Sequence, residues 1–323
     1  MSEKANTLSN RVRVMSVLGK YGTIISLLIL VLAFSIALPP FRTADNIVNL
    51  LGQLSLLSIF AAGMTCCLKM GDFDLSIGAM GAMTGIVVGQ LLSHGYSIPF
   101  SITAGLMVGL AAGCVNGLLV AYLELSAFVC TLATASILTG ATMAITKGMA
   151  IWDLPTSYGI IGQGYLYGIP IRFIIMIVLL TLLSLFHGFT TIGRRMEAIG
   201  GNPEAARMSG INVRFNRLIG FVLSGLCSSI GGIVLTSSVL SANATQGASY
   251  VLESFGACFI GAATVRIGQF HIWGTFVGVM FLVVAVNGLI IMMVPGYYTT
   301  MIQGAVLLLA IVLSGIGSRV LRR

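Results

Sequence analysis

Long apolar runs separated by short polar stretches dominate this chain. A helix needs about 20 apolar residues to cross the hydrocarbon core of a bilayer. Runs of roughly this length occupy residues 21–38, 47–69, 76–93, 98–121, 126–146, 171–187, 217–240, 249–265, 270–293 and 297–315. The connections are mostly short and contain proline, glycine or polar residues, such as "LPPFRTADN" and "VPGYY". The pattern predicts an all-α polytopic membrane protein with about ten transmembrane helices.

The composition agrees with a lipid environment for most of the chain. Charged residues make up 8% of the 323 residues, and hydrophobic residues make up 57%. A soluble domain carries about 25% charged residues because its surface faces water. The net charge of +8 does not indicate nucleic-acid binding, because the basic residues lie at the ends of apolar runs rather than in one patch.

The distribution of Lys and Arg predicts how the helices are oriented. With a cytoplasmic N-terminus, fourteen of the 17 Lys and Arg fall on the cytoplasmic side, and Arg42, Lys147 and Arg172 fall outside. Positively charged residues are retained on the cytoplasmic side of membranes. Both termini are therefore predicted to be cytoplasmic.

This orientation divides the chain into segments. A cytoplasmic N-terminal segment, 1–20, precedes a transmembrane domain, 21–318, and a basic cytoplasmic tail, 319–323, follows it. Two connections inside the domain are long. Residues 147–170 are predicted to form a periplasmic loop, and residues 188–216 form a polar cytoplasmic segment.

The cytoplasmic segment contains the signals of one complete short helix, within "GGNPEAARMSG". Asn202 is suited to cap the first free amides, and Pro203 occupies a position where its missing N–H costs nothing. Glu204 favours the positive end of the helix dipole, and Gly210 offers a left-handed stop. So short a helix is unstable alone in water, so we expect it to dock against something.

Two interpretations of this helix follow from the residues. In one, the helix completes a turn at the membrane surface, where its arginines meet lipid phosphates. In the other, it is a rigid contact for another protein, with Ala and Met as its packed face and Arg and Glu as its rim.

A second polar motif, "GDFDLS", lies between two apolar runs at residues 71–76. Charged groups at membrane depth are costly and usually functional. The helix count places this turn near the cytoplasmic face, beside Lys69, where exposure to water costs little. Asp74 is predicted to cap the third helix and Asp72 to pair with Lys69. Direct contact with a substrate, or movement of the turn into the bundle during gating, are alternatives. The candidate turn residues are Gly71, Asp72, Asp74, Leu75 and Ser76.

Four further polar residues are candidates for a transport pathway. Gln53, Asn116 and Asn287 lie within apolar runs, where an amide either bonds between helices or lines a passage. Glu253 lies near the outer end of the eighth run and either faces the pathway or pairs locally.

The chain lacks the motifs of catalysis and ATP hydrolysis. No G-x-x-x-x-G-K-[ST] phosphate-binding loop, H-E-x-x-H metal motif or nucleophile elbow occurs. The six cysteines lie inside apolar runs without C-x-x-C spacing, so no metal site is predicted. The chain is therefore predicted not to be an enzyme and to bind no cofactor, so any ATP that drives it is hydrolysed by another polypeptide.

Three stretches, in order, carry a resemblance to one family. "GRRMEAIGGNPEAARMSGINV" resembles the cytoplasmic coupling segment of ABC-importer permeases of the ribose/arabinose/xylose and branched-chain amino-acid type. "GMTCCLKMGDFDLSIGAMGAMTG" resembles the signature of that family, and "GYYTTMIQGAVLLLAIVL" resembles its last helix. The resemblance covers about residues 20–318. The chain departs from the family at 261–270, "GAATVRIGQF", where sugar permeases are rich in glycine.

The resemblance implies a function and partners. It implies the permease subunit of a bacterial inner-membrane importer for a monosaccharide, working with an ATP-binding subunit, a periplasmic sugar-binding protein that contacts 147–170, and a second permease copy, identical or related. Contact with the ATP-binding subunit is implied for Asn202, Pro203, Glu204, Ala205, Ala206, Arg207, Ser209 and Gly210. Branched-chain amino acids or another small polar solute are alternative substrates. An ion-coupled secondary transporter and an intramembrane enzyme are rival functions.

Overall fold

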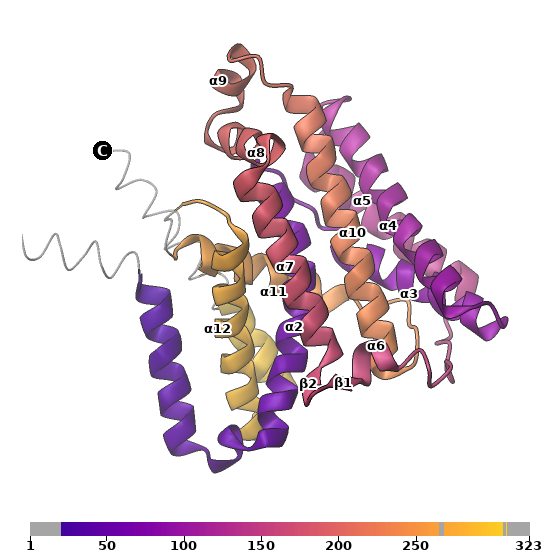
Figure 1. The fold of residues 1–323 in the computed structure, drawn as a ribbon, viewed down its shortest axis with the longest axis vertical. Helices are drawn as coiled ribbons and strands as arrows, with labels where there is room; N and C mark the ends of the chain where they lie inside the picture. Colours follow the sequence, from indigo (N-terminus) through magenta and orange to yellow (C-terminus); the bar gives the residue numbers. More distant parts are fainter. Residues whose placement is uncertain (1–20, 265–267, 306–307, 309–323) are drawn as a thin grey trace, which may run out of the picture. The chain divides into compact units, whose positions relative to one another are not determined.

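A computed structural model describes residues 21–264, 268–305 and 308, and helices form most of this part of the chain (Figure 1). Among the described residues, six helices are long and apolar enough to span a membrane: α2 (Ala44–Leu68), α4 (Ile98–Ala121), α5 (Ala127–Thr146), α7 (Ile171–Phe189), α10 (Val213–Val239) and α12 (Ile272–Ile291). Three shorter apolar helices are Tyr21–Ala37, α3 (Ile77–Ser93) and α11 (Ala248–Ala262). Residues 296–305 are also helical. The helical, polytopic membrane architecture is thus confirmed.

Short elements join these helices. They are η1 (Pro39–Arg42), α6 (Ile160–Gln163), β1 (Tyr165–Leu166), β2 (Ile169–Pro170), α8 (Thr191–Gly201) and α9 (Pro203–Met208). The two strands pair in antiparallel register, with Tyr165 opposite Pro170 and Leu166 opposite Ile169. The predicted N-terminal segment, basic tail and Arg266 lie outside the described residues.

The chain forms two compact units. One comprises residues 51–254, and the other combines the chain before residue 51 with the chain after residue 254. Both coupling-segment helices and the "GDFDLS" turn belong to the unit 51–254. This unit therefore carries most of the candidate site.

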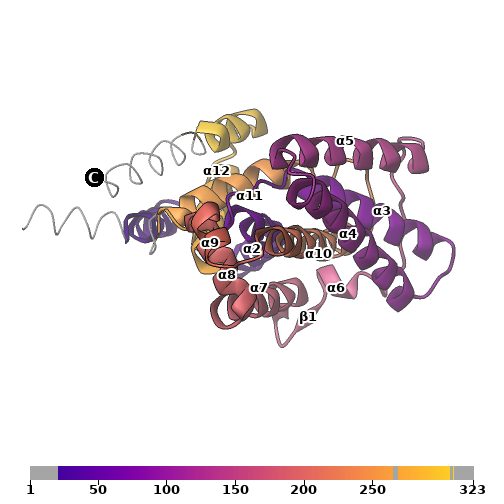
Figure 2. The ribbon, with the colours of Figure 1, turned by 90° about the horizontal axis from the view of Figure 1, so that it is seen from above.

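Within the unit 51–254, α10 is the central helix, with α2, α3, α4 and α7 around it (Figure 2). Glycines occur at every fourth position of α4, at 105, 109, 113 and 117, and line one face of the helix. A Cβ at Gly109 would overlap the Gly225 carbonyl of α10, and one at Gly113 would lie 2.5 Å from the Phe221 carbonyl oxygen. Small residues of this kind let membrane helices approach backbone to backbone.

Residues 147–170 are folded rather than extended. The Tyr158 hydroxyl is buried and donates to the Ile233 carbonyl of α10 at 2.9 Å. Burial raises the pKa of this phenol above its ordinary value. The hairpin β1–β2 ends in Tyr167, whose side chain is 98% exposed. The predicted loop therefore has an anchored part and an exposed tip.

The other unit contains a polar link between two helices. The Asn287 amide nitrogen donates to Asn46 Oδ1 at 2.9 Å, and Asn46 Nδ2 donates to Asn287 Oδ1 at 3.1 Å. The two amides thus satisfy each other across α12 and α2. Of the two sequence interpretations of Asn287, this geometry favours a bond between helices.

Candidate functional site

The coupling segment is held in place by an apolar cluster. Met196 and Ile199 of α8, Ala206 of α9 and Val213 of α10 are buried together with Met70, which follows α2. Burial of apolar surface of this kind supplies most of the stability of a short helix that is weak in isolation. The segment is therefore docked on the ends of the membrane helices.

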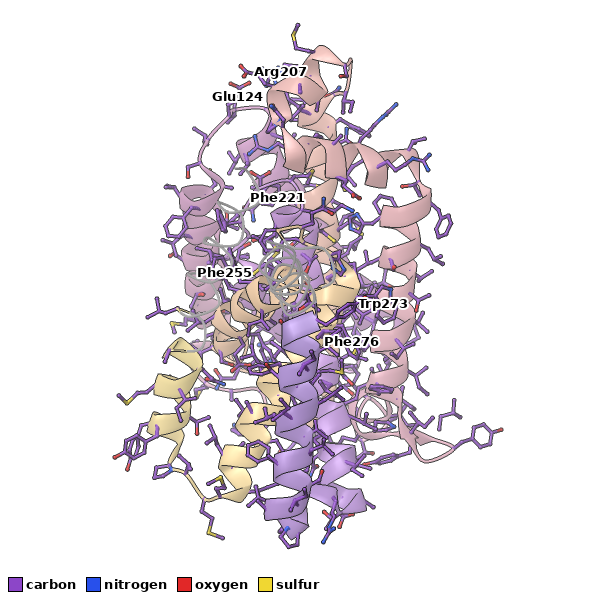
Figure 3. The ribbon with its side chains drawn as sticks, turned by 90° about the vertical axis from the view of Figure 1, so that its left-hand side faces the viewer. Glu124, Arg207, Phe221, Phe255, Trp273 and Phe276 are labelled. Carbon is purple, nitrogen blue, oxygen red and sulfur yellow. The ribbon has the colours of Figure 1, made fainter. Side chains whose placement is uncertain are left out.

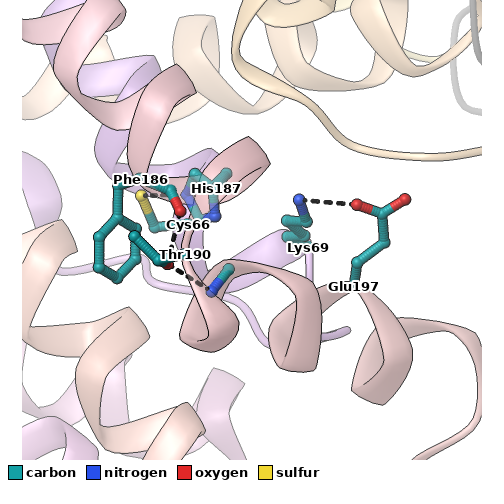
Figure 4. Close-up of polar contacts among 7 residues, drawn as sticks. Cys66, Lys69, Phe186, His187, Thr190 and Glu197 are labelled. Carbon is teal, nitrogen blue, oxygen red and sulfur yellow. Dashed lines mark hydrogen bonds and ion pairs between the residues drawn. The ribbon is translucent and has the colours of Figure 1, made fainter.

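The turn from α7 into α8 is tight. Thr190 caps α8, because its Oγ1 accepts from the Gly193 amide at 3.0 Å, and its hydroxyl donates to the Phe186 carbonyl at 2.6 Å (Figure 4). Nearby, Cys66 Sγ of α2 lies 3.5 Å from Nε2 of His187, which is buried on α7 (Figure 4). These contacts fix the start of the coupling segment against α2 and α7.

The caps predicted for α9 are confirmed. Asn202 Oδ1 accepts from the amides of Glu204 and Ala205, each at 3.0 Å. Pro203 occupies the first turn, and Gly210 has a left-handed φ of +79°. These local signals set both ends of α9.

The alanine and methionine positions predicted to contact another protein differ in exposure, and that contact stays a prediction. Ala206 is 4% exposed, whereas Met208 is 88% exposed and points away from the protein core. Glu204 and Arg207 are exposed, as are Asn202, Pro203, Ala205, Ser209 and Gly210. Six residues make fewer than two turns, so only one position of α9 faces inward. The helix presents an almost fully exposed surface.

Helix α8 was not predicted from the sequence. Ile192, Met196 and Ile199 recur at helical spacing, and Met196 and Ile199 are fully buried. This amphipathic signal was present in the sequence. Its arginines, Arg194 and Arg195, are exposed.

The predicted pairing of Asp72 with Lys69 was wrong. Asp72 instead forms a bidentate ion pair with Arg217 of α10, whose Nε lies 2.7 Å from Asp72 Oδ2. Lys69 Nζ lies 3.2 Å from Glu197 Oε2 of α8 (Figure 4). Close approach of α10 brings Arg217 to the turn, and α8 covers Lys69.

The "GDFDLS" turn is also more buried than predicted. Asp72 is 4% exposed and Asp74 is fully buried, although Gly71, at φ +85°, remains exposed. The helix count carries no information on the packing of α10 over the turn. The turn is therefore packed inside the unit 51–254, and its part in substrate contact or gating stays a prediction.

Asp74 does not cap α3 as predicted. Its Oδ1 accepts from the amide and hydroxyl of Ser76, at 3.0 and 2.5 Å, before the helix begins. Its Oδ2 accepts from the Ser224 hydroxyl of α10 at 2.7 Å. Burial raises the pKa of Asp74, while the hydrogen bonds from Ser76 and Ser224 act in the opposite direction. Three donors make burial of this carboxyl tolerable.

The network continues into α4 and α5. Asn116 donates to Ser76 Oγ at 2.9 Å, and its carbonyl accepts from Thr134 at 2.7 Å. The Leu75 amide donates to Thr131 Oγ1 at 3.1 Å. Asn116 is fully buried, so its role here is to join helices. Neither threonine, nor Ser224, was singled out from the sequence, because hydroxyls within apolar runs carry no local signal of their partners.

Two pathway candidates remain, one on α2 and one on α11. Gln53 is exposed on α2, and Glu253 is half-buried on α11. An exposed amide on a membrane helix is poorly suited to lipid, so it favours a polar surrounding. The network around Asn116 does not include either residue.

A further ion pair lies at the coupling end. Arg214 Nη2 lies 2.8 Å from Glu124 Oε1, in the connection between α4 and α5. The hydrogen bond from Arg214 lowers the pKa of the exposed Glu124 carboxyl. Glu124 and Arg207 lie at the same end of the molecule (Figure 3). This end therefore combines exposed charges of both signs.

The docked helix α9 is thus joined, through α10, to a buried polar turn. Residues 46–311 match the family described as branched-chain amino acid transport system / permease component. The chain belongs to this family. It is a multi-pass membrane permease of a bacterial ABC importer, a transport subunit and not an enzyme.

The permease is similar to curated relatives along most of its length. It is 36% identical to the ribose import permease protein RbsC of Bacillus subtilis, over 97% of this chain and 98% of that protein. It is 32% identical to the L-arabinose transport system permease protein AraH of Escherichia coli, over 91% of this chain and 89% of that protein. It is 29% identical to the D-allose transport system permease protein AlsC of Escherichia coli, over 93% of each chain. No solved structure matches it.

The polar groups of the described residues form structural contacts rather than a metal centre. Among the described residues, no group of three or more His, Cys, Asp and Glu is arranged to hold a metal ion. The ion pairs and the hydroxyl–amide network instead connect the coupling segment to α2, α3, α4 and α5.

The Lys69–Glu197 pair is expected to hold α8 against α2. Changing Glu197 to Gln should lower the stability of the permease by about 1 kcal/mol, because Lys69 is 9% exposed and loses its charged partner. The loss stays modest because Glu197 is 42% exposed and water screens the pair. Thermal unfolding in detergent measures the effect. Arg195→Ala, on the exposed face of α8, is the control and should leave the melting temperature unchanged; an equal loss in both variants contradicts the prediction.

Proposed function

We propose that the permease imports a monosaccharide of pentose or hexose type, as the membrane subunit of an ATP-driven importer. The observation that carries the proposal is similarity over about nine-tenths of the chain to permeases named for ribose, L-arabinose and D-allose. The docked coupling segment and its connection to the buried turn support an importer in which another subunit supplies the ATP chemistry.

In this proposal the coupling segment and both termini face the cytoplasm, and about ten helices cross the inner membrane. Two permease chains, identical or related, form the pathway. Residues 147–170 face outward, where the exposed hairpin tip at Tyr167 meets a periplasmic sugar-binding protein. Two ATP-binding subunits hold the α9 helices.

The contacts suggest how movement of α9 reaches the membrane. A displaced α9 carries the start of α10 with it, because only residues 209–212 separate the two helices. Arg217 then moves Asp72, while Ser224 moves Asp74. Ser76 and Asn116 pass the displacement to α4 and α5. ATP shifts the equilibrium between inward- and outward-open states through these differential contacts.

Branched-chain amino acids are the second candidate substrate, because the matching family is described by them. Uptake of labelled D-ribose, L-arabinose, D-allose and L-leucine into proteoliposomes holding the complete importer separates the two. We expect uptake of one of the sugars and none of leucine. Uptake of leucine alone would overturn the sugar assignment.

The α9 surface is expected to bind the ATP-binding subunit. Changing Glu204 and Arg207 together to Ala should reduce the amount of ATPase that copurifies with the tagged permease about tenfold, because both side chains are exposed on α9 and the loss of two polar contacts costs about 1.4 kcal/mol. The Asn202 and Pro203 caps are left intact, so the helix persists. Arg42→Ala, on the exposed η1, is the control. Undiminished ATPase in the double variant would contradict the prediction and favour the interpretation in which Arg207 meets lipid phosphates.

A further inference from the structure

Arg172 lies at the start of α7, at the end of the unit 51–254 that is far from α9 (Figure 1). Its guanidinium rests directly on Gly52 of α2. A Cβ at Gly52 would overlap the guanidinium, with Nε only 2.7 Å away. Glycine at position 52 is therefore what allows the arginine to lie on the helix backbone.

The Arg172 guanidinium is incompletely satisfied. Its Nε is buried, and it has no hydrogen-bond partner within the part of the chain that the structure describes. Leaving such a donor unpaired is energetically costly, and charged groups near membrane depth are usually functional. The side chain as a whole is only half-buried, so a ligand can still approach it.

Groups suited to a hydroxylated ligand occur on the neighbouring helices α2 and α11. Gln53, next to Gly52, presents an exposed amide. Tyr250 stacks on Phe60, with ring centroids 4.8 Å apart, and its phenol lies within electrostatic range of both Arg172 and Glu253. Together these residues offer hydrogen-bond donors, acceptors and an aromatic edge.

We propose that Arg172, with Gln53, Tyr250 and Glu253, forms a binding site for the hydroxyl groups of a neutral sugar at the outer end of the permease. The proposal rests on the proposed function and adds the residues that recognise the sugar. Arg172 donates to sugar hydroxyls, Glu253 and Gln53 accept from them, and the Tyr250 ring borders the apolar side of the sugar.

A sugar fits this position better than an acidic side chain of a docking protein. Arg172 lies flat on α2, with its Nε buried, whereas the exposed tip of this region is Tyr167 of the β1–β2 hairpin. A docking protein meets the tip first.

The test uses the permease with its ATP-binding subunit in nanodiscs, without the binding protein, and D-ribose as the probe. Saturation-transfer NMR should detect weak ribose binding to the unaltered complex. Arg172→Met should weaken binding at least tenfold, and Arg172→Lys, which keeps the charge but loses the planar fork, about threefold. Gln53→Leu, on an exposed position that needs no refolding, should also weaken it about threefold.

Three controls separate the outcomes. Copurified ATPase and the melting temperature show whether each variant is folded and assembled, and Gly140→Ala, on an exposed stretch of α5, should bind ribose normally. If folded Arg172→Met and Gln53→Leu variants bind ribose like the unaltered complex, the proposal is overturned. Tyr167→Ala is expected to lower capture of the binding protein. If Arg172→Met has the same effect and leaves ribose binding intact, Arg172 is a docking residue and the proposal is overturned. Absence of both an ATPase partner and sugar uptake in the unaltered importer contradicts the proposed function itself.

Discussion

Replacing Asp72 with Ala is expected to destabilise the permease by about 3 kcal/mol and to abolish most transport. The substitution leaves Arg217 without its carboxylate in a largely buried position, where its side chain is 26% exposed. Removing one partner of a buried ion pair costs about 3–5 kcal/mol, and partial exposure of Arg217 places this case at the lower end. A loss of 3 kcal/mol lowers the ratio of folded to unfolded protein more than a hundredfold.

Two comparisons isolate the ion pair. Asp45→Ala, at an exposed position in the first turn of α2, removes one carboxylate and should leave the melting temperature unchanged. The double variant Asp72→Asn with Arg217→Met removes both charges and should be more stable than Asp72→Ala, because no buried charge is left unpaired. A melting temperature of Asp72→Ala within a degree of the unaltered permease contradicts the pair.

The same variants test whether the pair transmits movement. In the double variant the fold is largely restored, but α10 no longer pulls on the "GDFDLS" turn through a charged contact. Sugar transported per ATP hydrolysed in proteoliposomes should therefore stay below that of the unaltered importer, although the ATPase still copurifies. Full recovery of this ratio would assign the pair to stability alone.

Features that depend on residues close together in the chain could be predicted from the sequence. Apolar length is a local property, so the runs coincide with helices along the described chain. The caps of α9 depend on Asn202, Pro203 and Gly210, which lie within nine residues of one another. Each has a conformational preference that acts without the rest of the fold.

Features that depend on contacts between residues far apart in the chain could not be predicted from the sequence. The partner of Asp72 is 145 positions away along the chain, and nothing in its neighbourhood favours Arg217 over the adjacent Lys69. An asparagine within an apolar run, such as Asn116, looks the same whether it bonds to another helix or to a solute. Burial of Asp74 likewise depends on how closely α10 approaches, and that approach was readable only from the glycine spacing of α4.

Replacing Gly225 with Val is expected to have a comparable effect, because α10 and α4 meet at this residue. A Cβ at Gly225 would overlap the Gly109 carbonyl oxygen and lie 3.1 Å from the Gly113 Cα. These are backbone atoms of a packed helix, which cannot move aside as a flexible side chain does. Overpacking a core costs about 1–3 kcal/mol or more, and this rigid contact places the valine variant at or above 3 kcal/mol.

A matched series on Gly140 decides whether sterics cause the loss. Gly140 lies in α5 with nothing within 4 Å of an added Cβ, so Ala or Val there should be neutral or slightly stabilising through helix propensity. At Gly225 the melting temperature should instead fall with side-chain size, from Gly to Ala to Val. Because Ser224 is the neighbour of Gly225 and holds Asp74, transport should fall along the same series. If Gly225→Ala raises the melting temperature as Gly140→Ala does, the backbones of α4 and α10 are not in contact. That result would also contradict the close approach of α10 that brings Arg217 and Ser224 to the buried turn.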